Sequence, residues 1–196
     1  MTAVSRETEA RLAVYVALLL KWTPQINLIA PSTVPAIAER HITDSLQLLD
    51  HLGTLPATWV DIGSGGGLPG LVVAAALPAS TGVTLIESDA RKCAFLRTAV
   101  RAMDLENVEI INRRIESAAP QNADIVSARA LAPLDRLLPL VARHLSPDGT
   151  ALLPKGRGWR DEIVTARRDW QFDFDALPSR TDEDAVILKI SKVSRV

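Results

Sequence analysis

The chain has 196 residues, a length that suits one domain and leaves little room for a second. Hydrophobic residues make up 47% of the chain and charged residues 23%, which together predict a folded protein with a sizeable core. The formal net charge of −1 is not typical of a general nucleic-acid binder, but it is compatible with a local basic patch. The single cysteine excludes an internal disulfide and a multi-cysteine zinc site, and we expect no bound metal.

Membrane and export signals are not evident in the sequence. The longest apolar runs, residues 13–20 and 71–77, are much shorter than the ~20 residues that span a membrane. The first residues do not combine a basic stretch with an apolar one, as a secretory signal peptide does. We therefore expect a cytoplasmic, monomeric protein with no membrane partner.

The first third of the chain is predicted to be helical. Apolar residues recur at helical spacing over residues 6–22, and Pro24 is expected to end this helix. A second helix is expected over residues 33–52, with Thr33 as its N-cap. We treat residues 1–56 as an N-terminal helical extension.

From residue 57 onward, short apolar runs alternate with helical patterns. This order predicts an α/β fold of the Rossmann-like kind, with a doubly wound, mostly parallel sheet and a C-terminal antiparallel hairpin. Residues 57–196 then form one structural unit with the extension. The expected strands are 59–62, 83–87, 108–112, 124–127, 150–154, 172–177 and 185–190, and the expected helices are 69–77, 90–103, 133–144 and 159–170.

A glycine-rich stretch follows the first expected strand and reads VDIGSGGGLPG over residues 60–70. Gly65, Gly67 and Gly70 fit G-x-G-x-x-G, which is a weak dinucleotide signal on its own. Asp61, Gly63, Gly65 and Gly67 fit D-x-G-x-G-x-G, which resembles the first motif of class I methyltransferases. We prefer the second interpretation, because a dehydrogenase needs a separate substrate domain that this chain has little room for. Glycines at such a turn let the backbone approach a ligand closely.

Glu87 ends the next expected strand, 20 residues after Gly67. An acid at this place can accept hydrogen bonds from both ribose hydroxyls of a bound nucleoside. The alternative is a solvated acid at a strand end. Cys93 lies at core spacing on the following helix, so we expect it to pack rather than to react.

Five short motifs, taken in order, resemble the bacterial ribosomal RNA small subunit methyltransferase G family, also called GidB. They are Lys21-Trp22 with Asn27-Leu28, RHITDSL over residues 40–46, DIGSGGGLPG over residues 61–70, Ser127-Ala128-Arg129-Ala130 with one alanine inserted, and Lys155-Gly156. The resemblance covers the whole chain and implies S-adenosylmethionine as cofactor. It also implies methylation at N7 of a guanosine in 16S ribosomal RNA, with that RNA or a small-subunit precursor as partner.

The resemblance also implies roles for individual residues at the cofactor. Gly63 and Leu68 would contact it, Ile115 and Glu116 would hold its adenine, and Arg129 would lie near the cofactor or the target guanine. Without the resemblance, core packing and a solvated loop acid are the plainer explanations of Ile115 and Glu116. The expected cofactor set is completed by Asp61, Ser64, Gly65, Gly67 and Glu87.

No catalytic acid or base is expected. Guanine N7 carries an in-plane lone pair and is unprotonated at neutral pH, so alignment of N7, the methyl carbon and the sulfur supplies most of the catalysis. The Asn/Asp-Pro-Pro-aromatic tetrad of adenine amine methyltransferases is absent after the fourth strand. Cys93 is not placed to serve as the nucleophile of a pyrimidine C5 enzyme.

RNA is expected to meet a local basic segment. Lys155, Arg157 and Arg160 are interleaved with glycines and Trp159, a composition that can hold phosphates and stack a base. The alternative is the start of a helix with solvated charges. His41 is expected either to pair with Asp44 or to contact RNA, and Asn27 completes the predicted RNA-binding set.

Three other functions compete with this interpretation. A small-molecule methyltransferase would need a closed apolar lid, which the N-terminal helices can form. A non-catalytic, ribosome-associated nucleotide-binding module would retain the fold without the reaction. A nicotinamide oxidoreductase is the weakest alternative.

Overall fold

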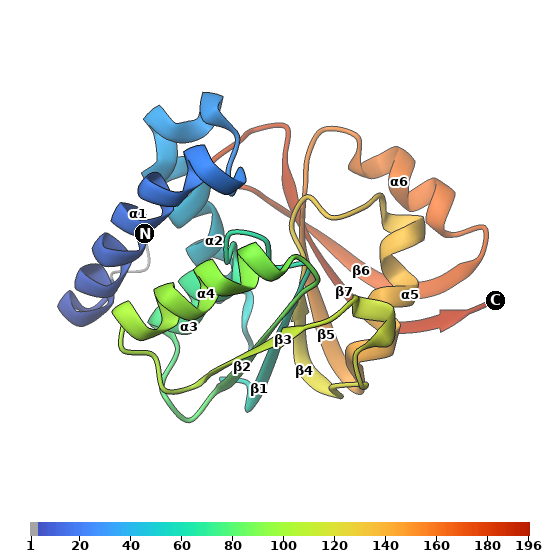
Figure 1. The fold of residues 1–196 in the computed structure, drawn as a ribbon. Helices are drawn as coiled ribbons and strands as arrows, with labels where there is room; N and C mark the ends of the chain where they lie inside the picture. Colours follow the sequence, from blue (N-terminus) through green and yellow to red (C-terminus); the bar gives the residue numbers. More distant parts are fainter. Residues whose placement is uncertain (1–3) are drawn as a thin grey trace.

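A seven-stranded sheet organises the computed structural model, which describes residues 4–196 (Figure 1). Its strand order is β3-β2-β1-β4-β5-β7-β6. The first five strands are parallel, and β7 pairs antiparallel with both β5 and β6. The predicted doubly wound sheet with a C-terminal hairpin is therefore confirmed. The strands are β1 (Thr58–Ile62), β2 (Gly82–Glu87), β3 (Val108–Asn112), β4 (Ala123–Ser127), β5 (Leu145–Lys155), β6 (Trp170–Pro178) and β7 (Val186–Arg195).

Helices cover both faces of this sheet and form two hydrophobic cores (Figure 1). One core joins α1, α3 and α4 to the sheet around the fully buried Trp59 and Phe95. The other joins α5 and α6 to the opposite face around Leu134 and Leu138. The helices are α1 (Arg6–Ile26), α2 (Asp44–Leu46), α3 (Gly70–Ala76), α4 (Ala90–Ala102), α5 (Leu134–His144) and α6 (Trp159–Ala166), with short turns η1 (Pro31–Ala36), η2 (Ala38–Thr43), η3 (Gln47–His51) and η4 (Ile115–Ser117).

The long helix α1 is bound to the sheet domain by polar contacts as well as by packing. The Thr8 hydroxyl donates to the carbonyl of Ala75 at 3.2 Å. The Arg11 guanidinium donates to the carbonyl of Met103 at 3.1 Å. The Tyr15 hydroxyl donates to the carbonyl of Gly66 at 2.5 Å, inside the glycine-rich loop. The extension therefore buttresses that loop directly.

Three helix boundaries differ from the sequence prediction. Pro24 does not end α1, because a proline this close to the C-terminal end removes only one hydrogen bond of the last turn. The helix ends at Asn27 instead, whose backbone is in the left-handed region at φ 50°. The expected helix over 33–52 is instead a series of 3-10, π and α turns, and Thr33 does not cap it. The last helix stops at Ala166 because Trp170 already pairs with Arg195 in the hairpin.

No helix within residues 4–196 combines the length and the apolarity that crossing a membrane requires.

Candidate functional site

The glycine-rich loop leaves the carboxyl end of β1 and turns sharply into α3. Gly63, Gly65 and Gly67 have φ angles of 68°, 53° and 84°, a backbone region that residues other than glycine rarely adopt. The Glu87 carboxylate accepts a hydrogen bond from the Gly65 amide at 2.8 Å and another from the Asp89 amide at 2.8 Å. Glu87 is thus a buried acid that fixes the loop, rather than a solvated one.

A cavity of about 870 Å³ opens beside this loop, and we call it the glycine-loop cavity. Five of the residues predicted to bind the cofactor line it together: Gly63, Gly65, Glu87, Ile115 and Glu116. They come from the ends of β1 and β2 and from η4 after β3. Ligands of open α/β sheets bind at this edge, outside the carboxyl ends of the strands.

The other predicted cofactor residues do not line the glycine-loop cavity. Ser64, Gly67 and Leu68 are buried within the loop, where the Ser64 hydroxyl donates to the Asp61 carbonyl at 2.9 Å. Asp61 lies fully buried beneath the loop and accepts from the Ser127 hydroxyl at 2.7 Å. Burial raises the pKa of Asp61 to about 6, and the Ser127 hydrogen bond opposes this rise. These residues support the loop from below.

A second cavity, of about 750 Å³, lies between η1, η2 and the connections after β4, β5 and β6. We call it the extension cavity. Arg129, which was predicted near the cofactor or the target base, lines this cavity and not the glycine-loop cavity. Its guanidinium donates to the Asp44 carboxylate at 3.2 Å and to the Arg40 carbonyl at 3.2 Å.

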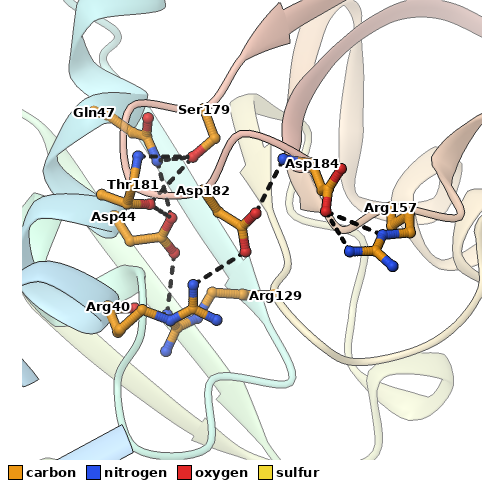
Figure 2. A network of polar contacts seen from close by, with 9 residues as sticks. All are labelled: Arg40, Asp44, Gln47, Arg129, Arg157, Ser179, Thr181, Asp182 and Asp184. Carbon is orange, nitrogen blue, oxygen red and sulfur yellow. Dashed lines mark hydrogen bonds and ion pairs between the residues drawn. The ribbon is translucent and has the colours of Figure 1, made fainter. Parts of the chain in front are cut away.

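Asp44 is the centre of a network that joins the extension to the β6–β7 connection (Figure 2). Besides Arg129, it accepts from the Gln47 amide at 2.9 Å and from the Thr181 hydroxyl at 2.8 Å. Asp182, on the same connection, accepts from Arg40 at 3.0 Å. Apart from the local Gln47–Asp44 bond, the sequence spacing gave no sign of these contacts, because they join residues 85 to 142 positions apart.

The sequence left two roles open for His41, a pairing with Asp44 or a contact with RNA. The pairing with Asp44 is not formed. The residue is 8% exposed, and its ring lies between Thr33 Oγ1 at 2.7 Å and the Arg129 guanidinium at 3.0 Å. Burial and the neighbouring Arg129 lower the pKa of His41 to about 4, so the ring is neutral at pH 7. Since Arg129 is a donor only, Nδ1 accepts and Nε2 donates to Thr33. His41 therefore orients Arg129 within the extension cavity.

Lys155 was predicted to meet RNA phosphates, but its side chain is only 9% exposed. The ammonium donates to the Ala132 carbonyl at 2.8 Å and to Glu162 Oε2 at 2.8 Å. Glu162 Oε2 also accepts from the Leu134 amide at 2.8 Å. Lys155 and Glu162 both line the extension cavity. Nothing in the sequence distinguishes Glu162, because a glutamate on a short amphipathic helix carries no particular signal.

The two cavities share one wall, made by Ala130, Leu131 and Ala132. Ala130 holds the left-handed φ of 52°, and Leu131 projects toward the glycine loop. A Cβ on Gly63 would come within 2.7 Å of Leu131 Cδ1, so the end of that side chain would have to shift, and the left-handed φ of 68° disfavours any residue other than glycine there. We call residues 130–132 the partition.

The remaining predicted RNA residues lie on the surface. Arg157 is 85% exposed and pairs with Asp184 on the β6–β7 connection, donating from Nε at 3.0 Å (Figure 2). Arg160 is exposed and stacks over Trp159, 4.3 Å from the ring centroid. Asn27 is exposed as the left-handed cap of α1, and it does not line the extension cavity.

Comparisons with known proteins assign nearly the whole chain to one family. The family described as "rRNA small subunit methyltransferase G", GidB, matches residues 8–182. A protein named ribosomal RNA small subunit methyltransferase G from Paracoccus denitrificans is 52% identical over 189 residues, which are 96% of this chain and 97% of that protein. A protein of the same name from Gluconobacter oxydans is 46% identical over 196 residues, covering all of both chains.

Solved structures resemble this chain at the level of the fold. A TehB-like SAM-dependent methyltransferase from Corynebacterium glutamicum has a TM-score of 0.62 and 16% identity, over 92% of this chain and 99% of that one. A SAM-dependent methyltransferase from Aquifex aeolicus has a TM-score of 0.63 and 14% identity, over 83% and 98% of the two chains. The predicted class I methyltransferase fold is confirmed.

Proposed function

Because this chain belongs to the rRNA small subunit methyltransferase G family, we propose that it transfers the methyl group of S-adenosylmethionine to N7 of a guanosine in 16S ribosomal RNA. One structural observation supports the proposal independently of family membership. Two cavities of similar size meet at the partition, at the carboxyl edge of the sheet. A methyl transfer needs this arrangement, with one chamber for the donor, one for the acceptor and a short path between them.

The glycine-loop cavity suits the methyl donor. Gly63 and Gly65 expose backbone without a Cβ, so the methionine part can approach closely. Glu87 stands at the next strand end, where a carboxylate can accept from ribose hydroxyls. Ile115 and Glu116 offer an apolar contact and a hydrogen-bond acceptor for an adenine. When bound, the cofactor supplies an activated methyl group on a sulfonium.

The extension cavity suits the acceptor base. Arg129 reaches it from the segment after β4 and is held in place by Asp44 and His41. Lys155 and Glu162 lie on its wall beside the partition. N7 has a free lone pair at neutral pH, so these residues have to position the base, and they need not remove a proton.

We expect exposed arginines near the extension cavity to contact the phosphate backbone of the RNA. Arg40, Arg157 and Arg160 are solvent-exposed; Arg40 lines the extension cavity, and Arg157 directly follows Gly156, which lines it as well. Asp182 and Asp184 already neutralise two of them in the protein alone. RNA phosphates would have to replace these carboxylates, which makes binding dependent on salt.

The test uses small subunits, and RNA extracted from them, from cells that lack this methyltransferase. We incubate both with the protein and labelled S-adenosylmethionine, digest the RNA and identify the modified nucleoside by mass spectrometry. The expected product is 7-methylguanosine at one position of 16S RNA. The control is Gly63→Val, which places a branched side chain at a left-handed backbone position in the wall of the glycine-loop cavity and should give no product. Transfer to another nucleoside, or no transfer to either substrate, would refute the proposal.

A further inference from the structure

The Glu162 carboxylate is bound on one side only. Its Oε2 atom accepts from the Leu134 amide and from the Lys155 ammonium, both at 2.8 Å. Within residues 4–196, Oε1 has no hydrogen bond to another residue, although the side chain is 27% exposed and lines the extension cavity. Two fixed donors hold the carboxylate in one orientation, so Oε1 is a preset acceptor in the cavity wall.

This acceptor lies close to the place where the methyl group must pass. Lys155 bonds Glu162 and also the carbonyl of Ala132, which belongs to the partition between the two cavities. A base whose N7 reaches the partition therefore has its remaining edges within the extension cavity, beside Glu162.

Guanine and adenine present opposite groups to such an acceptor. The Watson–Crick edge of guanine carries two adjacent donors, N1–H and the exocyclic N2 amine, whereas the N1 atom of adenine is an acceptor. Base edges in single-stranded RNA are read by side-chain hydrogen bonds of this kind. A site built around a hydrogen bond rejects a ligand that leaves its polar group unpaired.

We infer that Glu162 reads the target guanine by accepting hydrogen bonds from N1–H and the N2 amine, an inference that rests on the proposed function. The same contact assists the reaction. Guanine N7 supplies the lone pair for the new bond to the methyl carbon, the pair of the broken bond stays on sulfur, and the positive charge passes to the purine. The N1–H bond to a carboxylate strengthens as this charge arrives, so it favours the transition state over the bound substrate.

The test is a comparison of two substrates and three proteins. Small-subunit RNA is assembled by ligation with guanosine or inosine at the position mapped above. Inosine keeps N7, O6 and N1–H but lacks the N2 amine. Single-turnover methylation rates are measured at saturating RNA for the wild type, for Glu162→Gln and for Asp161→Asn. Asp161 is an exposed acid on the same helix, and its substitution removes the same formal charge away from the cavity.

We expect the wild type and Asp161→Asn to methylate guanosine on the order of tenfold faster than inosine, because one hydrogen bond to a charged group is lost. In Glu162→Gln the rate on guanosine should fall and the preference for guanosine should shrink toward one. A purely structural role for Glu162 would lower both rates and leave their ratio unchanged, and that result would overturn the inference. Should Glu162→Gln fail to fold, equal rates for the two substrates in the wild type would overturn it as well. Methylation of guanosine by the wild type in the same assay shows that the proposed function holds in either case.

Discussion

Tyr15 offers a direct test of whether the N-terminal extension supports the glycine-rich loop. Its hydroxyl donates to the Gly66 carbonyl at 2.5 Å, and both residues are buried. Burial raises the pKa of Tyr15, so the hydroxyl stays protonated and remains a donor at any pH at which the protein is studied. The substitution Tyr15→Phe removes this donor and keeps the ring, which packs against Phe95 at a centroid distance of 6.4 Å.

The size of the effect follows from what the substitution leaves behind. A buried carbonyl without its donor costs about 1–3 kcal/mol, and Phe avoids the cost of burying a hydroxyl. We therefore expect the free energy of unfolding to fall by about 1–2 kcal/mol. Because Gly66 lies between Gly65 and Gly67, whose backbone must stay in the left-handed region, we also expect weaker binding of S-adenosylmethionine, by less than tenfold.

Urea unfolding of the wild type and of Tyr15→Phe measures the first effect, and calorimetric titration with S-adenosylmethionine measures the second. Thr98→Val serves as the matched control, because it removes an exposed hydroxyl that bonds within α4, to the Ala94 carbonyl at 2.9 Å. The control should stay within about 0.5 kcal/mol of the wild type. Equal stability and equal cofactor affinity in Tyr15→Phe would show that the extension does not support the loop.

Three further predictions concern single carboxylates and one surface arginine. Glu87→Gln should weaken S-adenosylmethionine binding by about 1–2 kcal/mol in calorimetry, because an amide is a poorer acceptor than a carboxylate, whereas Glu109→Gln on the exposed surface of β3 should not. Asp61 has a pKa raised to about 6, so its contribution to stability is full below about pH 4 and is lost as the pH rises through 6. The difference in unfolding free energy between the wild type and Asp61→Asn should therefore grow by about 2 kcal/mol between pH 7 and pH 4.5. Arg157→Ala should reduce the slope of log RNA affinity against log salt by about 0.7, while Arg168→Ala, in the exposed turn after α6, should not.

Each of these predictions has a result that contradicts it. An unchanged dissociation constant in Glu87→Gln would leave the acid with a purely local role in the loop. A pH-independent difference between the wild type and Asp61→Asn would show that Asp61 stays ionised in the folded protein at acidic pH. A wild-type salt slope in Arg157→Ala would move the RNA surface away from the β6–β7 connection.

The sheet was predictable because its signals are local. Each strand is a short apolar run followed by a helical pattern, and the order of such units determines a parallel sheet. The glycine-rich loop and Glu87 were predictable for the same reason, since a turn and a strand end are read from neighbouring residues. The structure places both of them on one cavity, as the sequence indicated.

The parts that were not predictable depend on contacts between distant segments. The expected helix over 33–52 breaks into short turns whose side chains serve Arg129 and the β6–β7 connection. Lys155 looks like a surface cation in the sequence, yet its side chain is only 9% exposed, and its ammonium is bound by Glu162, seven residues along the chain in the first turn of α6. Secondary-structure propensity of single residues says nothing about which distant side chains will pair. The residues that form the wall of the extension cavity were therefore identified only in the structure.

The contacts of α1 also say something about the order in which the protein assembles. This helix is synthesised before its partners Gly66, Ala75 and Met103, which come 51 to 92 residues later. Contacts that distant in sequence close large loops and form slowly. Until β1, α3 and α4 exist, the apolar face of α1 has nothing to cover it, and a chain interrupted before residue 103 exposes that face to other molecules. Helix α1 can therefore dock only after these later segments have formed, and its docking brings the Tyr15 hydroxyl onto the glycine-rich loop.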